Sequence, residues 1–161
     1  MRRTLPIVLL VGAATLAGCG GTANVEGDFS INVANRENGC GFDNWDGNTA
    51  ANIPVGITQD GESATATVGG LTATFLDLWL GGHVFNGSVD GSHLELTLTG
   101  TRAQSQGACA YTYDAVIDAD IDGDVLTGEI RYEAKTNGQA DCGTLNGCAS
   151  VQELNGARPP T

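Results

Sequence analysis

The clearest pattern along the chain is the alternation of apolar and polar residues that marks a β-strand with one buried face. In residues 92–99 (SHLELTLT), Leu94, Leu96 and Leu98 share one face and polar residues occupy the other. Residues 110–121 alternate in the same way, with Val116 as an exception, and the pattern resumes after a turn. This second apolar face contains Tyr111, Tyr113, Ala115, Ile117, Ala119, Ile121, Leu126, Ile130, Tyr132 and Ala134. Together the segments predict an antiparallel sheet with one dry face.

Three Asp-Gly pairs divide the alternating segments at even intervals. They begin at Asp60, Asp90 and Asp122, and apolar alternation runs into and out of each. Asp-Gly supplies the positive φ angles of type I′ turns and is a strong hairpin signal. The spacing predicts an all-β meander of about eight or nine strands, which closes most easily into an antiparallel up-and-down β-barrel. A β-sandwich is the alternative.

One segment, residues 71–80 (LTATFLDLWL), fits two structures. Its apolar residues stand at helical offsets (Leu71, Phe75, Leu78 and Trp79) and also at alternate positions (Leu76, Leu78 and Leu80). If the segment is a strand that crosses the barrel, Cys109 begins its own strand at the opposite end from Cys40. If it is a short helix or lid, Cys40, Cys109, Cys142 and Cys148 all lie at one end. A Cys40–Cys109 disulfide, which needs Cα atoms within about 7 Å, would favour the lid.

The N-terminus carries the pattern of a bacterial export signal. Arg2 and Arg3 precede a short apolar run, residues 5–16, which is too short for a typical membrane span. The residues Leu16-Ala17-Gly18-Cys19 resemble, at every position, the lipobox of bacterial lipoproteins. The resemblance implies cleavage before Cys19, attachment of acyl chains such as palmitate to it, and a lipid anchor in the cell envelope. Gly20 stands where an aspartate would resemble the inner-membrane retention signal, which points to the outer membrane.

These signals divide the chain into three parts. We expect a lipoprotein signal peptide over residues 1–18, a lipidated tether over 19–26 and a single β-barrel domain over 27–161. The whole chain has a formal net charge of −12, and removal of two arginines with the signal leaves −14. Such an acidic surface repels the phosphate backbone of nucleic acids. We therefore exclude nucleic acids as partners.

Four cysteines remain once Cys19 is assigned to the lipid. They are Cys40, Cys109, Cys142 and Cys148, and an even number in an oxidising compartment predicts two disulfides. No CxxC pair or Cys/His cluster has zinc spacing. Cys142 and Cys148 bracket a turn-rich loop (GTLNG) that a local bridge could close, which would leave Cys40 with Cys109. The other two pairings stay open, because sequence does not fix connectivity.

The acidic hairpin at residues 118–129 (DADIDGDVLTGE) nearly follows the ligand order of an EF-hand calcium loop. Its flanks, however, alternate and are rich in β-branched and aromatic residues, which predicts strands instead of the helices that an EF-hand needs. Ile121 and Leu126 also depart from that pattern, and a hairpin would place both in the core. What remains is a possible weak Ca²⁺ site at the turn, formed by Asp120, Asp122 and Asp124. No other cofactor is expected.

Other chemistry is sparse. His93 and Glu95 share a strand face and could ligate a metal, although a solvated polar face is the commoner meaning of so isolated a pair. Trp45 and Trp79 could plug a barrel end or stack on a ligand, although aromatic core packing is the commoner role and is expected for at least one of them. The chain has neither a Gly-x-Ser-x-Gly elbow nor a phosphate-binding glycine pattern.

Three classes of function are compatible with these features. The first is a non-enzymatic lipid-anchored barrel that binds a small apolar or amphipathic ligand, as lipocalin-like folds do, or an envelope protein. The second is a filled structural scaffold with an acidic outer face and a weak Ca²⁺ site at residues 118–124. The third, an exported enzyme, lacks a recognisable motif. A cavity of at least ~300 Å³ would favour the first over the second. We expect a non-enzymatic binding or surface-interaction lipoprotein.

Overall fold

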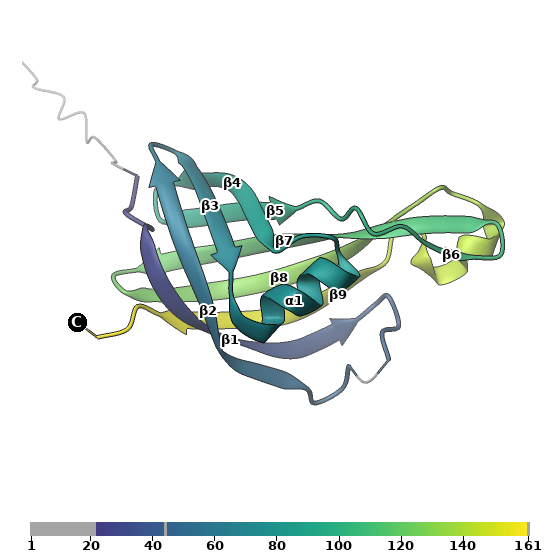
Figure 1. Ribbon diagram of the computed structural model, residues 1–161, viewed down its shortest axis with the longest axis horizontal. Coiled ribbons are helices and arrows are strands. Elements are labelled where there is room, and N and C mark those ends of the chain that lie inside the picture. Colours follow the sequence, from purple (N-terminus) through teal and green to yellow (C-terminus); the bar gives the residue numbers. More distant parts are fainter. Residues whose placement is uncertain (1–21, 44, 161) are drawn as a thin grey trace, which may run out of the picture.

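Nine β-strands, one α-helix and one 3₁₀ helix make up the described part of the chain, residues 22–43 and 45–160, in the computed structural model (Figure 1). In chain order they are β1 (Gly27–Asn38), β2 (Thr49–Asp60), β3 (Ser63–Val68), α1 (Gly70–Trp79), β4 (Val84–Asp90), β5 (His93–Leu98), β6 (Gln104–Gln106), β7 (Cys109–Asp122), β8 (Val125–Thr136), η1 (Ala140–Leu145) and β9 (Ala149–Ala157). Cys19 and the predicted signal peptide lie outside the described residues.

Eight of the strands form a closed antiparallel barrel. The sheet order is β5-β4-β3-β2-β1-β9-β8-β7-β6, and a further pairing of β5 with β7 closes the ring. The short strand β6 pairs only with the first residues of β7 and stands outside the ring. This arrangement confirms the predicted all-β barrel. Closure leaves the long strands of the ring without a free edge along most of their length.

All three Asp-Gly pairs form the predicted hairpins, but with a different turn type. In each case the aspartate is the last residue of its strand, and the glycine is the first of two turn residues. Gly61, Gly91 and Gly123 have φ angles of 62°, 60° and 60°, whereas the residues that follow them do not have positive φ. Glycine at the first central position is the pattern of a type II′ turn, not of the expected type I′.

The predicted alternation places the expected residues in the core. Leu94, Leu96 and Leu98 on β5 are buried, as are Ala115, Ile117, Ala119 and Ile121 on β7. The partner strand β8 pairs with β7 without a register shift over its whole length, so Leu126 and Tyr132 also face inward. Because side chains alternate with period two, the acidic residues of β7 are left on the outer face.

Segment 71–80 is a helix. Gly70 adopts a φ of +64°, which turns the chain away from β3, and Leu80 and Gly81 both donate backbone hydrogen bonds to the Leu76 carbonyl at its end. Gly81 has a φ of +94°, and a Cβ there would lie 2.1 Å from Thr101 Oγ1. The helix buries Leu76, while three of the four helical-offset residues are largely exposed: Leu71 is 90 % exposed, Phe75 58 % and Leu78 70 %. The fourth, Trp79, is partly buried against the core.

The four cysteines all lie at the end of the barrel where α1 lies, as expected if the segment is a lid, but the predicted pairing is wrong. The disulfides join Cys40 to Cys148 and Cys109 to Cys142, each with a Cα–Cα distance of 4.9 Å. Cys40 pairs with Cys148 because β1 and β9 are adjacent strands, which brings the loop after β1 beside the start of β9. Cys142 and Cys148 are close in the sequence, but the strand order, and not this closeness, decides which cysteines pair.

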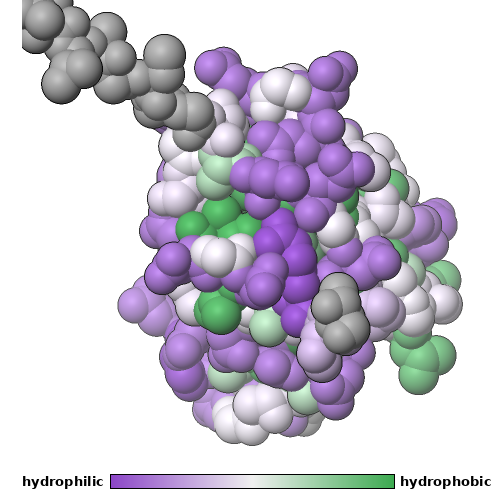
Figure 2. Space-filling model, turned by 90° about the vertical axis from the view of Figure 1, so that its left-hand side faces the viewer, coloured by the Kyte–Doolittle hydropathy of each residue, from purple (hydrophilic) through white to green (hydrophobic). Residues whose placement is uncertain are grey.

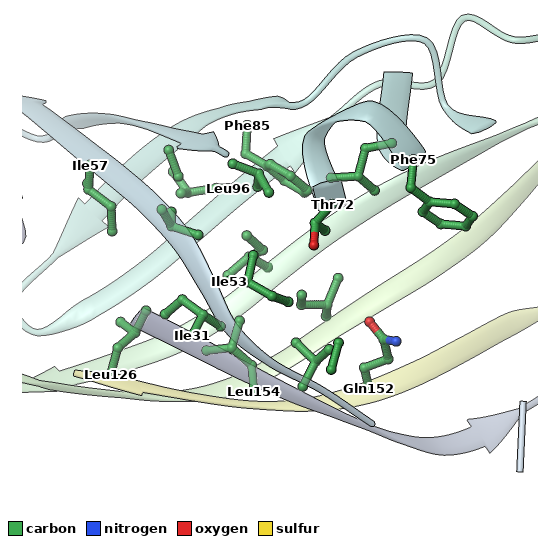
Figure 3. A pocket seen from close by; sticks show the side chains of 18 of the residues that line it. Ile31, Ile53, Ile57, Thr72, Phe75, Phe85, Leu96, Leu126, Gln152 and Leu154 are labelled. Carbon is green, nitrogen blue, oxygen red and sulfur yellow. The ribbon is translucent and has the colours of Figure 1, made fainter. Parts of the chain in front are cut away.

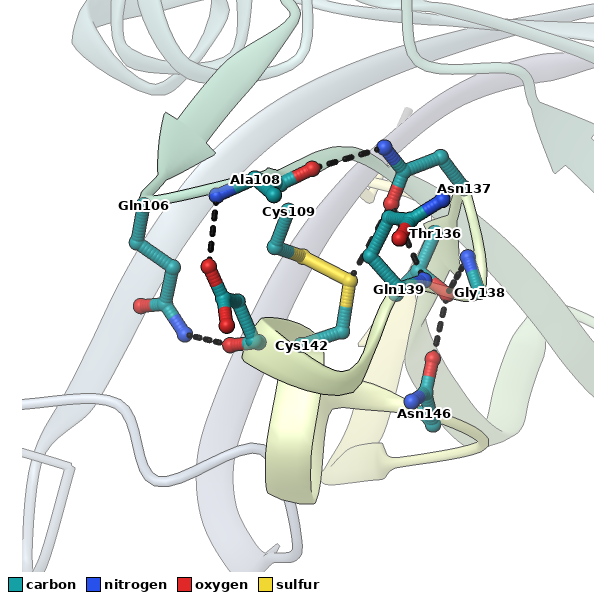
Figure 4. Close-up of a disulfide and its surroundings, with 10 residues drawn as sticks. Gln106, Ala108, Cys109, Thr136, Asn137, Gly138, Gln139, Cys142 and Asn146 are labelled. Atoms are coloured by element: carbon teal, nitrogen blue, oxygen red, sulfur yellow. Dashed lines mark hydrogen bonds between the residues drawn. A yellow bond between two sulfur atoms is a disulfide. The ribbon is translucent and has the colours of Figure 1, made fainter.

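The second disulfide joins η1 to the start of β7 (Figure 4). Hydrogen bonds reinforce the junction: the Ala108 N–H donates to Asp141 Oδ2 (2.7 Å), and Asn137 Nδ2 donates to the Ala108 carbonyl (3.0 Å). Gln106 Nε2 donates to the Asp141 carbonyl at 3.0 Å. Strand β6, the start of β7 and η1 therefore form one cross-linked extension at this end of the barrel, as Figure 1 shows.

The opposite end of the barrel, which holds the three hairpin turns, is closed by the residues just before β1 and just after β9. The Ala23 N–H donates to the Gly91 carbonyl, and the Val25 N–H donates to Gln59 Oε1. Arg158 donates to the backbone carbonyls of Asn24, Glu26 and Gly123 and lies 4.8 Å from the Phe29 ring centre. Figure 2 shows this face, where hydrophilic residues surround a smaller hydrophobic area. Part of the segment expected to act as a tether, residues 23–26, is thus packed against the barrel.

Candidate functional site: an apolar cavity in the barrel

An aromatic cluster plugs the barrel at the end that holds the cysteines. Phe42 is its centre, with ring centroids 5.3 Å from Trp45, 5.3 Å from Trp79 and 5.1 Å from Tyr113. Trp79 on α1 also lies 5.0 Å from Tyr132. Trp45 is buried in the core, as expected for at least one of the two tryptophans. Both tryptophans contact other rings and neither lines the cavity described next, which favours a plug over a ligand-stacking surface.

Between this plug and the closed end lies a cavity of about 380 Å³. Its walls come from α1 and every strand of the ring, and nearly all of the residues are aliphatic or aromatic. They are Ile31, Val33, Ala50, Ile53, Val55, Ile57, Ala66, Val68, Leu71, Thr72, Phe75, Leu76, Phe85, Leu94, Leu96, Ile117, Leu126, Ile130, Tyr132, Gln152 and Leu154. The volume exceeds the ~300 Å³ that separates a binding barrel from a filled one.

The cavity reaches the surface beneath α1. Leu71 and Phe75 line it although both are largely exposed, and Ala50 on the facing strand β2 is exposed as well. Figure 3 shows Phe75 and Gln152 at one end of the cavity and Ile57 and Leu126 at the other. Ile57 lies near the hairpin turn that follows β2, and Leu126 lies near the turn that precedes β8, so the deep end of the cavity is the closed end of the barrel.

A chain of oriented hydrogen bonds lies beside the mouth. The Tyr132 hydroxyl donates to Gln152 Oε1 (2.9 Å), Gln152 Nε2 donates to Asn35 Oδ1 (2.6 Å), and Asn35 Nδ2 donates to the Trp45 carbonyl (2.6 Å). This sequence of donors and acceptors fixes the orientation of both amides. Gln152 therefore presents its amide to the cavity in one defined orientation, held between β8 and β1.

Burial controls the ionisation of the two tyrosines at this end. Burial raises the pKa of Tyr132 well above its ordinary value of 10, so its hydroxyl remains protonated and able to donate. Burial, and secondarily the neighbouring Tyr111, raises the pKa of Tyr113 to about 12. Both groups are neutral at physiological pH, so neither brings a charge to the site.

The residues proposed for cation binding lie outside the cavity. Asp120 projects from the outer face of β7, where its Oδ1 lies 3.4 Å from His93 Nδ1. Asp122 ends β7, and Asp124 Oδ1 accepts a hydrogen bond from Arg158 at 3.0 Å. Within residues 22–43 and 45–160, no three His, Cys, Asp or Glu side chains come together as a metal-binding group. Ca²⁺ binding at this turn stays a prediction.

The histidines form pairs on the outer surface. His93 lies between two carboxylates of β7, with its Nε2 3.8 Å from Asp118 Oδ1 in addition to the Asp120 contact. His83 Nδ1 lies 2.7 Å from Asp77 Oδ1, next to the end of α1. Glu95 pairs in register with Asp118, so it shares this outer face with His93.

Sequence reasoning missed the most informative residue of the site, Gln152. Within β9, Gln152 has the same parity as Leu154, which is buried. That parity was the available signal that an amide would face the interior. Thr72 was also missed, because the structure of segment 71–80 was left open.

Comparisons with protein-family models, curated proteins and solved structures give no match to this chain. Among the described residues, no helix has the length and apolar character needed to span a membrane. The site must therefore be interpreted from its own geometry.

Proposed function

We propose that this protein is a lipid-anchored, exported binding protein that holds a small apolar or amphipathic molecule inside its barrel. The observation that supports this most is the cavity of about 380 Å³, which lies within the range of small-molecule sites and has an open mouth. A filled scaffold would have no such space. Burying the apolar part of a ligand there yields roughly 0.8 kcal/mol for each methylene.

The role proposed is binding without catalysis. The described lining offers only the Thr72 and Tyr132 hydroxyls and the Gln152 amide as polar side chains. General acid–base or nucleophilic chemistry uses groups such as carboxylate, imidazole, amine or thiol, activated by a neighbour. A neutral hydroxyl and an amide serve better to orient a ligand than to transform it.

The anchor would set the orientation of the barrel. Ala23 is the first residue fixed to the barrel by a described hydrogen bond, and Cys19 precedes it by four residues, a reach of at most ~14 Å. A lipid on Cys19 would hold the hairpin-turn end near the membrane and leave the mouth beneath α1 facing away from it. Replacement C19S should release the protein from envelope membranes; unchanged fractionation would contradict the anchor.

Binding can be tested directly with 1-decanol and isoleucine methyl NMR on the C19S domain. The predicted mature chain has six isoleucines, of which five line the cavity (Ile31, Ile53, Ile57, Ile117 and Ile130). The sixth, Ile121, is buried outside it and serves as an internal control. We expect saturable shifts of the five cavity methyls and a much smaller change at Ile121. If no cavity methyl moves up to the solubility limit of the alcohol, the binding function is wrong.

A further inference from the structure

Two neutral polar groups face each other at the mouth of the cavity. In Figure 3 the Thr72 hydroxyl points from α1 into the space above Ile53, and the Gln152 amide rises from the opposite wall. Gln152 uses one N–H and one lone pair in its bonds to Asn35 and Tyr132, which leaves one N–H and one lone pair for a ligand. The mouth can therefore both donate and accept a hydrogen bond.

No described residue of the lining carries a charge. An ionised group that enters such a site loses its hydration without gaining an opposite charge, which is far costlier than burying a hydroxyl that finds a partner. The strongly acidic chain adds a long-range repulsion of anions, since its formal net charge is −12, or −14 without the two arginines of the predicted signal. Both effects act against a carboxylate, and the first acts against an ammonium as well.

The size of the cavity limits the apolar part of the ligand. A water-sized group occupies about 30 Å³ in a liquid, so 380 Å³ gives room for about a dozen such groups. A single chain of about ten carbons with one polar end matches this volume. The apolar deep end, at Ile57 and Leu126, and the polar mouth, at Thr72 and Gln152, give that chain one direction of entry.

We infer, building on the proposed function, that the cavity selects an uncharged single-chain amphipath of about ten carbons. Its hydroxyl or carbonyl group binds Thr72 and Gln152, and the anionic carboxylate of the same chain length is rejected. The cavity distinguishes the two ligands because no charged side chain at the mouth balances the charge of a carboxylate. Shape cannot distinguish them, since an alcohol and a carboxylate of ten carbons have nearly the same outline.

The test compares 1-decanol with decanoic acid at pH 5.5 and 7.5, by calorimetry and by the isoleucine methyl shifts. A carboxyl group with an ordinary pKa of about 4.3 is about a hundredfold less protonated at pH 7.5 than at pH 5.5. We expect the apparent Kd of decanoic acid to rise by about that factor. The Kd of decanol should stay constant, which controls for titration of the protein itself.

Two outcomes overturn the inference in distinguishable ways. Decanoate that binds at pH 7.5 within about threefold of decanol would refute charge exclusion while leaving the binding function intact. Cavity methyls that respond to neither probe would refute the binding function and this inference together.

Matched variants test the position of the polar group. T72V removes one hydroxyl and keeps the side-chain shape, and T74V makes the same change on the exposed side of α1. We expect T72V to weaken decanol binding about fivefold, the value of one hydrogen bond, and T74V to leave it unchanged. Q152L should also weaken binding, with Q139L as the exposed control. If T72V and Q152L both bind decanol like the unmodified domain, the placement of the polar group is wrong.

Discussion

A pair of alanines on β3 offers a sharp test of the cavity. Ala66 and Ala64 are both buried and point into the barrel from the same strand, but only Ala66 lines the cavity. Ala66 lies between Ile57 and Phe85 in the sheet, and both of these neighbours also line the cavity. The substitution A66L should therefore place its added carbons in empty space, whereas A64L should force them into packed atoms.

The two substitutions should change the free energy of unfolding in opposite directions. Three added methylene-sized groups in A66L contribute about 2.4 kcal/mol of burial, and the lost rotamer freedom of leucine costs about 0.5–1 kcal/mol. The free energy of unfolding should rise by about 1–2 kcal/mol. Overpacking in A64L should lower it by about 1–3 kcal/mol. The same three groups displace about three ligand methylenes, so A66L should weaken decanol binding by up to about sixtyfold.

Equilibrium unfolding in guanidinium chloride, followed by the fluorescence of Trp45 and Trp79 with the disulfides intact, measures both stabilities. Calorimetry with decanol measures the change in affinity. An A66L variant that loses 1 kcal/mol or more, as A64L should, would show that the space beside Ala66 is filled. An A66L variant of raised stability and unchanged decanol affinity would show instead that decanol binds elsewhere.

Replacing Cys40 and Cys148 together by alanine should lower the free energy of unfolding by about 4–5 kcal/mol, and replacing Cys109 and Cys142 by about 3–4 kcal/mol, because the loops span 108 and 33 residues; urea titration would contradict this if the order were reversed. Tyr113, with its pKa raised to about 12, keeps its proton in the folded state above pH 10 while the unfolded chain loses it. Stability should therefore fall between pH 10 and 12 by up to ~1.4 kcal/mol per pH unit from this residue, and Y113F should remove that part of the loss in urea midpoints measured across this range. In a series of 1-alkanols, affinity should rise about fourfold per methylene to about ten carbons and then level off; a rise that continues beyond fourteen would contradict the cavity size.

The hairpins and the barrel could be predicted because their signals are local. Alternation with period two assigns each residue of β5, β7 and β8 to a face, and each Asp-Gly pair marks a bend regardless of what lies across the barrel. Even the turn-type error is local, since it concerns which two residues occupy the bend. The structure of helix α1 was harder to predict, because its apolar residues fit both the helical and the strand period. Two of its exposed apolar residues, Leu71 and Phe75, line the mouth of the cavity.

The cavity and the disulfide pairing were beyond the reach of local patterns. Cys40 meets Cys148 because β1 lies beside β9, a neighbourhood made only when the ring closes. A void of about 380 Å³ depends on how side chains from eight strands and α1 fill a shared volume, and no segment contains that information. Gln152 illustrates the limit of prediction from local patterns. Its place in the strand alternation could indicate that its amide points inward, but not that Tyr132 and Asn35 would hold that amide at the mouth of a cavity.

The sequence by itself determined the alternating strands, the three bends, the even set of cysteines and the acidic outer face, because each depends on a residue and its near neighbours. The tertiary structure alone decided which cysteines pair, that residues 70–79 form a helix at the mouth, and that the barrel encloses an uncharged apolar space. These features arise from contacts between residues far apart in the chain, which form only when β5 meets β7 and the barrel closes.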